Sequence, residues 1–203
     1  MNQSKKYNKE YDHHSRWMSY WHQIKNIFDL EPNSIVEIGV GSGVLSEYLK
    51  KRDFNIFTLD IDNFLKPDMV CDISSQYIDG IYSDVVCAFQ VLEHINLNKI
   101  ETALDNICRM SKKNVVISLP QNVFSFKFYF KIPLFKSFKL LLIIPKLRKN
   151  RYFQKNGHYW EIGNIGTSKK WLIKSFKKRG FELVKSYTVF ENSYHVFFVF
   201  KKI

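Results

Sequence analysis

The chain has 203 residues, which is enough for one domain with a full hydrophobic core. An apolar content of 45% excludes a disordered chain, and no uncharged apolar stretch is long enough to suggest a membrane-spanning helix. The net charge of +12 favours an anionic partner or surface, although a lysine-rich surface without a partner would give the same balance.

The first element that we expect is an amphipathic helix near the N-terminus. Apolar side chains recur with helical spacing between residues 17 and 28, and a Glu-Pro-Asn sequence at 31–33 ends the pattern. The face that carries Trp17 is expected to pack on the body of the protein. The tyrosines Tyr7 and Tyr11 either pack in the same way or close over a bound ligand.

The compartment is indicated by the N-terminus and the cysteines. Residues 1–14 are too polar for a signal peptide. The three cysteines show no C-x-x-C spacing, so we expect reduced thiols in a cytoplasmic protein: Cys71, Cys87 and Cys108.

A strand, a glycine turn and a helix follow in succession. The apolar run at 35–38 predicts a buried strand, three glycines follow at every second position, and the next residues have amphipathic helical spacing: Gly39, Gly41 and Gly43, then 44–51. Glycines let the backbone turn sharply and approach a ligand closely. A dinucleotide fingerprint and a P-loop are both excluded, because the third glycine of G-x-G-x-x-G would fall on Val44 or Ser46 and no G-x-x-x-x-G-K-[ST] occurs.

What remains is the pattern E-x-G-x-G-x-G, with Glu37 inside the end of the strand. A second strand, at 55–59, ends in Asp60, whose carboxylate can accept hydrogen bonds from two ribose hydroxyls. A nucleoside that carries a carboxylate and no pyrophosphate fits this arrangement, and S-adenosylmethionine is such a molecule.

Three segments, VEIGVGSGVLSEYLKK, FTLDID and SDVVCAFQVLEHI, resemble the class I S-adenosylmethionine-dependent methyltransferases over residues 34–120. The alternative is a Rossmann-like domain that binds another nucleoside or none. The resemblance implies an α/β fold with a mostly parallel seven-stranded sheet, an antiparallel terminal hairpin and helices on both faces. It also implies a set of cofactor-binding residues: Glu37, Gly39, Gly41, Gly43, Asp60, Ile61, Asp72 and Gln90. Asp72 either contacts the adenine amino group or caps the turn that follows it.

Further elements follow in the expected order. Residues 69–71 predict a short third strand, and the continuous apolar run at 83–89 predicts a strand buried on both faces. Because ligands bind at the carboxyl ends of parallel strands, Gln90, Glu93 and His94 are expected near the site. The spacing from Asn98 to Glu101 predicts a capping box for a helix through residue 110, and 114–120 predicts the next strand.

A basic and aromatic insertion spans residues 121–157. Between residues 123 and 155 lie nine basic residues and no acidic one: Lys127, Lys131, Lys136, Lys139, Lys146, Arg148, Lys149, Arg151 and Lys155. We expect a lid over the active-site end, divided by Pro133 and Pro145 into short helices. Its apolar face either covers the acceptor pocket or docks on an anionic membrane surface. Nucleic-acid binding is the third possibility, but no N/D-P-P-Y/F sequence, catalytic cysteine pair or recognition domain accompanies it.

The chain closes with a helix from 167 or 168 to 179 and two strands at 181–190 and 194–201. Only three residues separate these strands, so they must form an antiparallel hairpin. We therefore expect one methyltransferase domain over 1–203, with an N-terminal helical region at 1–32.

Methyl transfer requires positioning of the acceptor, and a base only where the acceptor must lose a proton. His94 and His158 are the candidate catalytic residues, although His94 could instead make a structural hydrogen bond. No metal is expected, because His13 and His14 belong to no metal-ligand pattern. The expected function is methyl transfer to a small-molecule, glycan-precursor or lipid-linked acceptor, in the cytoplasm or at the inner face of the membrane. The alternatives are an RNA methyltransferase and a non-catalytic cofactor-binding homologue.

Overall fold

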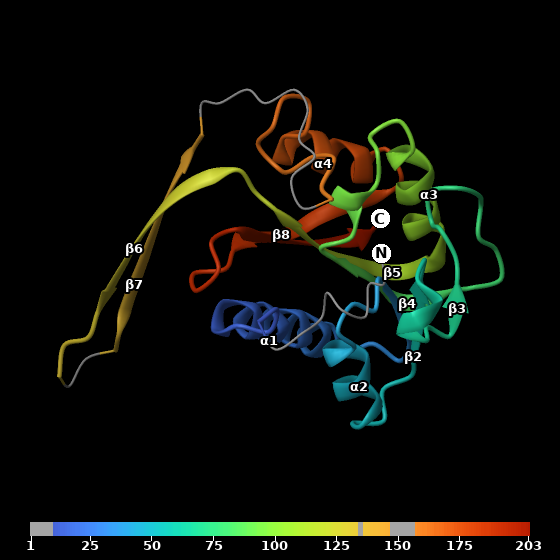
Figure 1. The fold of residues 1–203 in the computed structure, drawn as a ribbon, viewed down its shortest axis with the longest axis horizontal. Helices are drawn as coiled ribbons and strands as arrows, with labels where there is room; N and C mark the ends of the chain where they lie inside the picture. The colour runs from blue at the N-terminus through green and yellow to red at the C-terminus, as the bar shows by residue number, and fades with distance from the viewer. Residues whose placement is uncertain (1–9, 134–135, 147–156) are drawn as a thin grey trace.

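The computed structural model describes residues 10–133, 136–146 and 157–203, and it contains the expected seven-stranded sheet (Figure 1). Neighbouring strands follow the order β3-β2-β1-β4-β5-β9-β8. Only β9 is reversed, since it runs antiparallel to both β5 and β8. The strands are β1 (Ile35–Ile38), β2 (Ile56–Asp60), β3 (Met69–Val70), β4 (Ser83–Phe89), β5 (Ser111–Pro120), β8 (Phe181–Thr188) and β9 (His195–Lys202). The fold class expected from the sequence is confirmed.

Helices cover both faces of this sheet. The helices α1 (His14–Leu30) and α2 (Val44–Lys50) lie on one face, and α3 (Ile100–Met110) and α4 (Lys169–Lys177) lie on the other (Figure 1). The central strand β4 is buried along its whole length, which explains the unbroken apolar run at 85–89. Its side chains alternate between two hydrophobic clusters, with Val85 and Cys87 on the α1 side and Val86 and Ala88 on the α3 side. Among the described residues, no helix combines the length and the apolar character that crossing a membrane requires.

One expectation about the helices holds only in part, and another is wrong. Trp17 is 52% exposed, whereas Tyr20 and Ile27 of the same predicted apolar face are buried, together with polar residues of α1. The capping box does not form: Lys99 is the N-cap of α3 and makes no side-chain cap bond. The Asn98 N–H instead donates to Asn96 Oδ1, 3.2 Å away, so the loop before α3 is closed locally.

The insertion contains a β-hairpin rather than the expected short helices. The strands β6 (Val123–Phe130) and β7 (Phe138–Pro145) pair antiparallel with each other and with no strand of the main sheet. The hairpin projects from the body of the molecule (Figure 1). Pro133 lies in the connection between its strands, where a proline breaks no ladder. The basic residues Arg148, Lys149, Arg151 and Lys155 lie outside the described residues.

The insertion leaves and rejoins the body at one place, which we call the neck. Gln121 and Ile162 form an isolated parallel bridge. The Asn122 N–H donates to the Ile162 carbonyl at 2.8 Å, and the Ile162 N–H donates to the Pro120 carbonyl at 2.9 Å. The side chain of Asn122 also donates to Asn164 Oδ1 at 3.1 Å. The start of the insertion is therefore bonded to residues 162 and 164, a few positions after its end.

Candidate active site

A cleft of about 1210 Å³ opens at the carboxyl ends of β1, β2 and β4. Strand ends, the N-terminal part of α1 and residues 157–159 line it. All but one of the site residues predicted from the sequence line this cleft, the exception being Gly43: Glu37, Gly39, Gly41, Asp60, Ile61, Asp72, Gln90, His94 and His158. The fold thus brings together residues that lie far apart in the chain, and their roles stay predictions.

The glycine turn between β1 and α2 requires glycine at its first position. Gly39 has φ +83°, in the region that side-chain-bearing residues rarely adopt. A Cβ atom built on it would lie 2.3 Å from Val91 Cγ2. Gly41 and Gly43 also have positive φ, at 58° and 76°, and α2 begins directly after Gly43. The turn therefore brings bare backbone and a helix N-terminus to the edge of the cleft.

Asp60, the last residue of β2, holds this turn in place. Its carboxylate accepts hydrogen bonds from the Val40 N–H at 2.8 Å and from the Asp62 N–H at 2.9 Å. Each carboxylate oxygen has two lone pairs, so each keeps acceptor capacity for a ligand hydroxyl. The exposed Ile61 beside it lines the cleft as well.

Glu37 presents an unusual carboxyl group to the cleft. Burial raises its pKa to about 8, and its Oε2 has no hydrogen-bond partner among the described residues. A buried carboxyl oxygen without a partner is costly unless a ligand satisfies it. The ammonium group in the methionine part of S-adenosylmethionine is a suitable partner, so the residues present fit that cofactor.

Asp72 and Gln90 complete the predicted cofactor set. Asp72 Oδ1 accepts hydrogen bonds from the Ser74 N–H at 2.8 Å and the Ser74 hydroxyl at 2.7 Å, so the expected turn cap is present. Gln90 directly follows β4 and has φ +58°, a costly conformation for a residue with a side chain. Its amide donates to Ser118 Oγ at 3.1 Å, which ties it to β5.

The two predicted catalytic histidines meet in the part of the cleft lined by residues 93–96 and 157–159, which we call the acceptor end. The His94 and His158 ring centroids are 4.8 Å apart, with the rings nearly perpendicular. His94 Nδ1 lies 2.9 Å from the Gly157 carbonyl oxygen. Since a carbonyl can only accept, Nδ1 carries the hydrogen and Nε2 of the neutral ring is unprotonated. His94 therefore makes the structural bond that was the alternative prediction and still has a basic nitrogen.

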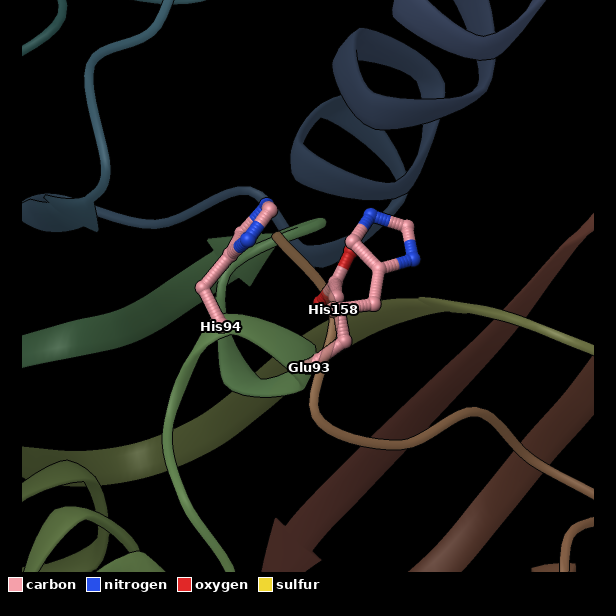
Figure 2. A group of neighbouring side chains, drawn as sticks. All are labelled: Glu93, His94 and His158. Atoms are coloured by element: carbon pink, nitrogen blue, oxygen red, sulfur yellow. The ribbon is translucent and has the colours of Figure 1, made fainter. Parts of the chain in front are cut away.

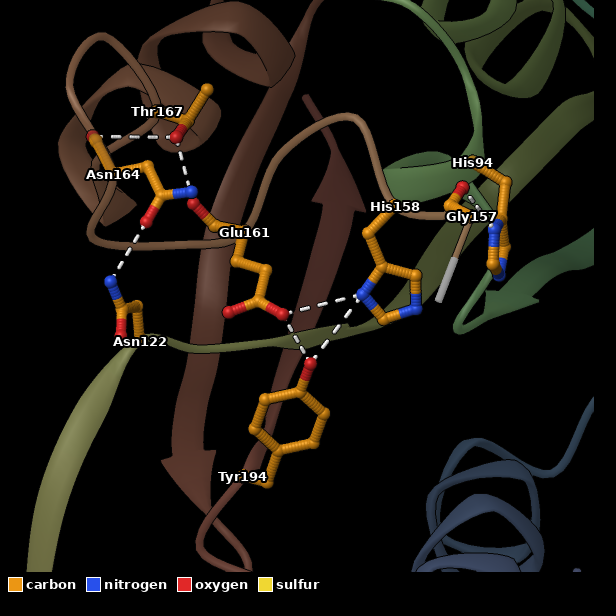
Figure 3. A network of polar contacts seen from close by, with 8 residues as sticks. All are labelled: His94, Asn122, Gly157, His158, Glu161, Asn164, Thr167 and Tyr194. Atoms are coloured by element: carbon orange, nitrogen blue, oxygen red, sulfur yellow. Dashed lines mark hydrogen bonds and ion pairs between the residues drawn. The ribbon is translucent and has the colours of Figure 1, made fainter. Parts of the chain in front are cut away.

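His158 is held by a buried carboxylate and a tyrosine (Figure 3). Its Nδ1 lies 3.3 Å from Glu161 Oε1 and 3.4 Å from the Tyr194 hydroxyl, which itself donates to Glu161. Burial and the bond to Glu161 raise the pKa of Tyr194, so the hydroxyl stays protonated and remains a donor. Glu161 is left as the acceptor for Nδ1–H, so Nε2 of the neutral His158 ring is also unprotonated.

A comparison with protein families identifies the family of the protein that contains this cleft. The family model described as a methyltransferase domain matches residues 11–186, which is most of the chain. The protein belongs to the class I S-adenosylmethionine-dependent methyltransferases. Its cofactor is therefore S-adenosylmethionine, as the glycine turn and Asp60 predicted.

Solved structures of other methyltransferases share the fold at low sequence identity. The N-methyltransferase NodS from Bradyrhizobium japonicum, in complex with S-adenosyl-L-homocysteine, has a TM-score of 0.65 at 12% identity, over 99% of this chain and 97% of that one. Magnesium protoporphyrin IX methyltransferase from Synechocystis has a TM-score of 0.64 at 11% identity, over 93% and 84%. A Burkholderia thailandensis 1,6-didemethyltoxoflavin-N1-methyltransferase has a TM-score of 0.64 at 12% identity, over 99% and 84%. Comparison with the curated proteins finds none that matches.

Several residues in the cleft of this methyltransferase, or in contact with its lining, were not predicted as site residues. Glu161 stands three residues after His158, a spacing that could have identified it. Tyr194 lies in the β8–β9 loop, and no pattern in the neighbouring sequence indicated that it is a site residue. On α1, the Tyr20 hydroxyl lies 2.8 Å from Ser42 Oγ and so packs the helix against the glycine turn. Arg16 Nε is buried in the same cleft without a hydrogen-bond partner among the described residues.

Of the two tyrosines before α1, Tyr11 lines the cleft, and the Arg16 guanidinium lies 4.3 Å from its ring centroid. Tyr7 lies outside the described residues. The hairpin does not line the cleft at any of its described positions, so residues 123–133 and 136–146 are not the lid that the sequence predicted.

Proposed function

We propose that this methyltransferase transfers the methyl group of S-adenosylmethionine to a hydroxyl of an anionic acceptor, of the glycan-precursor or lipid-linked kind. The observation that carries the proposal is the arrangement of the cleft. The glycine turn, Glu37 and Asp60 line it together with His94 and His158, whose neutral rings carry no hydrogen on Nε2.

The chemistry that follows is a single displacement. The acceptor oxygen bonds to the methyl carbon, the carbon–sulfur bond breaks, S-adenosylhomocysteine leaves, and the hydroxyl proton is lost. The sulfonium is already activated, so the protein must position the acceptor and promote loss of its proton. A neutral amine needs no such help before transfer. Two histidines with basic Nε2 atoms therefore favour an oxygen acceptor over a nitrogen acceptor.

Arg16 supports an acceptor that carries negative charge. Its Nε is buried in the cleft and lacks a hydrogen-bond partner among the described residues. Guanidinium groups bind carboxylates and phosphates through paired N–H donors, and a buried unsatisfied donor is costly without such a ligand. A phosphate or carboxylate on the acceptor would complete this site.

The hairpin supports an acceptor at a membrane surface. Alternate residues of a strand share one face, and the β6–β7 register pairs the residues of that face with one another. The face is wholly apolar, and its side chains are each 38% to 59% exposed: Phe124, Phe126, Phe128, Phe130, Phe138, Leu140, Leu142 and Ile144. Exposed apolar surface of this extent, contiguous along a projecting element, indicates a contact partner.

The charges around this face favour anionic lipid as that partner. Residues 123–146 include five lysines and no acidic residue, and Lys131 and Lys136 lie in the connection between the strands. Lys139 pairs with Glu191 at 2.7 Å and Lys127 bonds the Glu191 carbonyl at 3.0 Å, which fastens the hairpin to the β8–β9 loop. A face of this kind can enter the headgroup boundary while lysines meet anionic headgroups. The protein would then work at the cytoplasmic face of a membrane.

Acceptor identity is tested by incubating the protein and labelled S-adenosylmethionine with the lipid, glycan-precursor, small-molecule and RNA fractions of a cell. The proposal expects label in an anionic lipid or glycan-precursor fraction, in a base-stable bond to oxygen. Label in RNA, or on nitrogen, would contradict it. Asp60→Ala provides the control for cofactor-dependent labelling.

Membrane docking is tested by sedimentation with vesicles that contain anionic lipid at ~0.05 M salt, where screening is weak. The protein should sediment, and Phe126→Ser/Phe128→Ser should remain in solution. Val184→Ser, which removes a 60% exposed apolar side chain from β8 instead, should sediment like the wild type. A wild type that ignores anionic vesicles would overturn the membrane part of the proposal, and retention on RNA instead would assign the hairpin to nucleic acid.

A further inference from the structure

We propose that Glu93, His94 and His158 form a binding site for a divalent metal ion at the acceptor end of the cleft. One potential ligand atom from each side chain lies within 4.8 Å of the other two. Figure 2 shows the two imidazoles on either side of the Glu93 carboxylate. This inference rests on the proposed function, because it names the group through which the two histidines act on the acceptor.

Both histidines are prepared as metal ligands. Metal-binding histidines almost always donate the hydrogen of their second ring nitrogen to a carbonyl or a carboxylate, which fixes the ring and its tautomer. His94 donates from Nδ1 to the Gly157 carbonyl at 2.9 Å, and the Nδ1 of His158 faces Glu161 Oε1 at 3.3 Å. The Nε2 atom of each ring is therefore in the neutral, unprotonated form that a metal ion requires.

The third ligand belongs to the same short helix as His94. Glu93 and His94 lie in η3 (Leu92–His94), at the carboxyl end of β4, and Glu93 is fully buried while lining the cleft. The Glu93 carbonyl accepts the Tyr159 N–H at 2.8 Å, so the segment that carries two ligands is bonded to the segment that carries His158. Two atoms at about 2.1 Å from one ion can lie at most about 4.2 Å apart. Binding would therefore contract the cluster slightly, which the exposed His94 side chain permits.

The ligand set indicates the class of metal. Two imidazoles and one carboxylate suit the first-row transition ions from Mn²⁺ to Zn²⁺ better than Ca²⁺ or Mg²⁺, which prefer oxygen. Three protein ligands leave coordination positions open to the acceptor. With two neutral imidazoles and one carboxylate, the bound ion keeps a net positive charge. Arg16 adds another positive charge to this cleft, which again favours an anionic acceptor.

An ion at this place would change how the hydroxyl is activated. A hydroxyl that coordinates a divalent ion has a lowered pKa and loses its proton to solvent more easily. The resulting oxygen attacks the methyl carbon, and the carbon–sulfur electron pair leaves with S-adenosylhomocysteine. His158 would then be a ligand and not the base. The sequence predicted no metal because 64 positions separate His94 from His158 and no local spacing connects them.

The test uses the full chain after treatment with a chelator, titrated with Mn²⁺ and followed by the electron paramagnetic resonance signal of the free ion. Neither cofactor nor acceptor is added. We expect one ion per chain, bound at least tenfold more weakly by Glu93→Gln and by His158→Gln. Glu161→Gln, which keeps all three ligands, should weaken binding about 10- to 100-fold through the lost support of His158. His14→Gln, at an exposed histidine outside the cleft, should bind like the wild type.

Calorimetry with S-adenosylhomocysteine shows whether each variant is folded. Absence of Mn²⁺ binding, or binding that Glu93→Gln and His158→Gln leave unchanged, overturns the metal site. Hydroxyl methylation that proceeds undiminished in excess chelator overturns the ion's part in the reaction, since the histidines would then act as bases themselves. A bound ion without any methylated hydroxyl would instead overturn the proposed function and leave the metal site standing.

Discussion

Substitution of Gly39 by alanine tests the turn on which the cofactor site depends. The alanine must adopt φ +83°, which costs a residue with a Cβ about 1–2 kcal/mol. Its Cβ would also lie 2.3 Å from Val91 Cγ2, and the displacement of packed atoms adds about 1–3 kcal/mol. The sum, about 2–5 kcal/mol, corresponds to a fall in Tm of about 4–20 °C for a chain of this size. Weaker S-adenosylhomocysteine binding should accompany it, because Val91 and the turn both line the cleft.

Two further variants separate strain from steric overlap. Gly180 has φ +78° and no atom within 4 Å of the position that a Cβ would occupy, so Gly180→Ala carries the conformational cost alone, about 1–2 kcal/mol. In Gly39→Ala/Val91→Ala the nearest atom becomes the Cβ of residue 91 at 3.6 Å, an ordinary contact. Thermal denaturation and calorimetry with S-adenosylhomocysteine measure all three variants. If Gly39→Ala loses no more stability than Gly180→Ala, the overlap with Val91 is not what requires glycine.

Three other predictions concern the cleft. Asp60→Ala should weaken S-adenosylhomocysteine binding by about 1–3 kcal/mol in calorimetry, because the bonds to Val40 and Asp62 and those to the ligand are lost together. His158→Ala should lower kcat about 10²-fold or more while leaving the KM for S-adenosylmethionine nearly unchanged, and an unaltered kcat would remove His158 from catalysis. Glu37 has a folded pKa of about 8 against an ordinary value of 4.5, so the stability that it contributes is full below pH 4.5 and is lost as the pH rises through 8. Chemical denaturation between pH 5 and pH 9 should show this loss in the wild type and a flatter profile in Glu37→Gln.

The sheet could be predicted from the sequence because its strands have strong local signals. The strands β1 and β4 consist mainly of apolar residues, as is typical of strands buried on both faces, and glycines or polar residues mark their ends. The cofactor end of the cleft was predictable for the same reason: Glu37, Gly39 and Asp60 stand directly at strand ends. The position of a residue at a strand end can be predicted from local sequence, without knowing how distant parts of the chain pack.

The hairpin was predicted wrongly although its signal was present. Phe124, Phe126, Phe128 and Phe130 alternate with period two, which is the strand pattern. The expectation of short helices came from Pro133 and Pro145, because a proline interrupts a longer helix. In this hairpin the apolar face comes from cross-strand pairing, and the partner residues 138–145 lie eight or more positions from those of β6.

The acceptor end of the cleft depends on packing that no local pattern encodes. The contact between His94 and Gly157 spans 63 positions, and that between Glu161 and Tyr194 spans 33. Each contact exists only because β4, β5 and β9 lie side by side in the sheet. Each histidine could be predicted separately from the sequence: His94 because it follows a strand end, and His158 because it lies in an aromatic loop. Their pairing follows from the topology alone.

The neck has a consequence for how a chain of this kind can change. Gln121 and Asn122 are bonded to residues 162 and 164, so the segment between them begins and ends at the same place on the body of the protein. Shortening a segment of this kind changes the free-energy cost of loop closure by only about 0.6 kcal/mol for each halving of its length. A deletion or exchange of the hairpin would leave the ladder from β5 to β9 intact. Because His158 and Glu161 also lie between these residues, only an exchange confined to the hairpin, residues 123–146, would keep them. Such an exchange could change the surface that this enzyme contacts without altering the bonds described for its cofactor site.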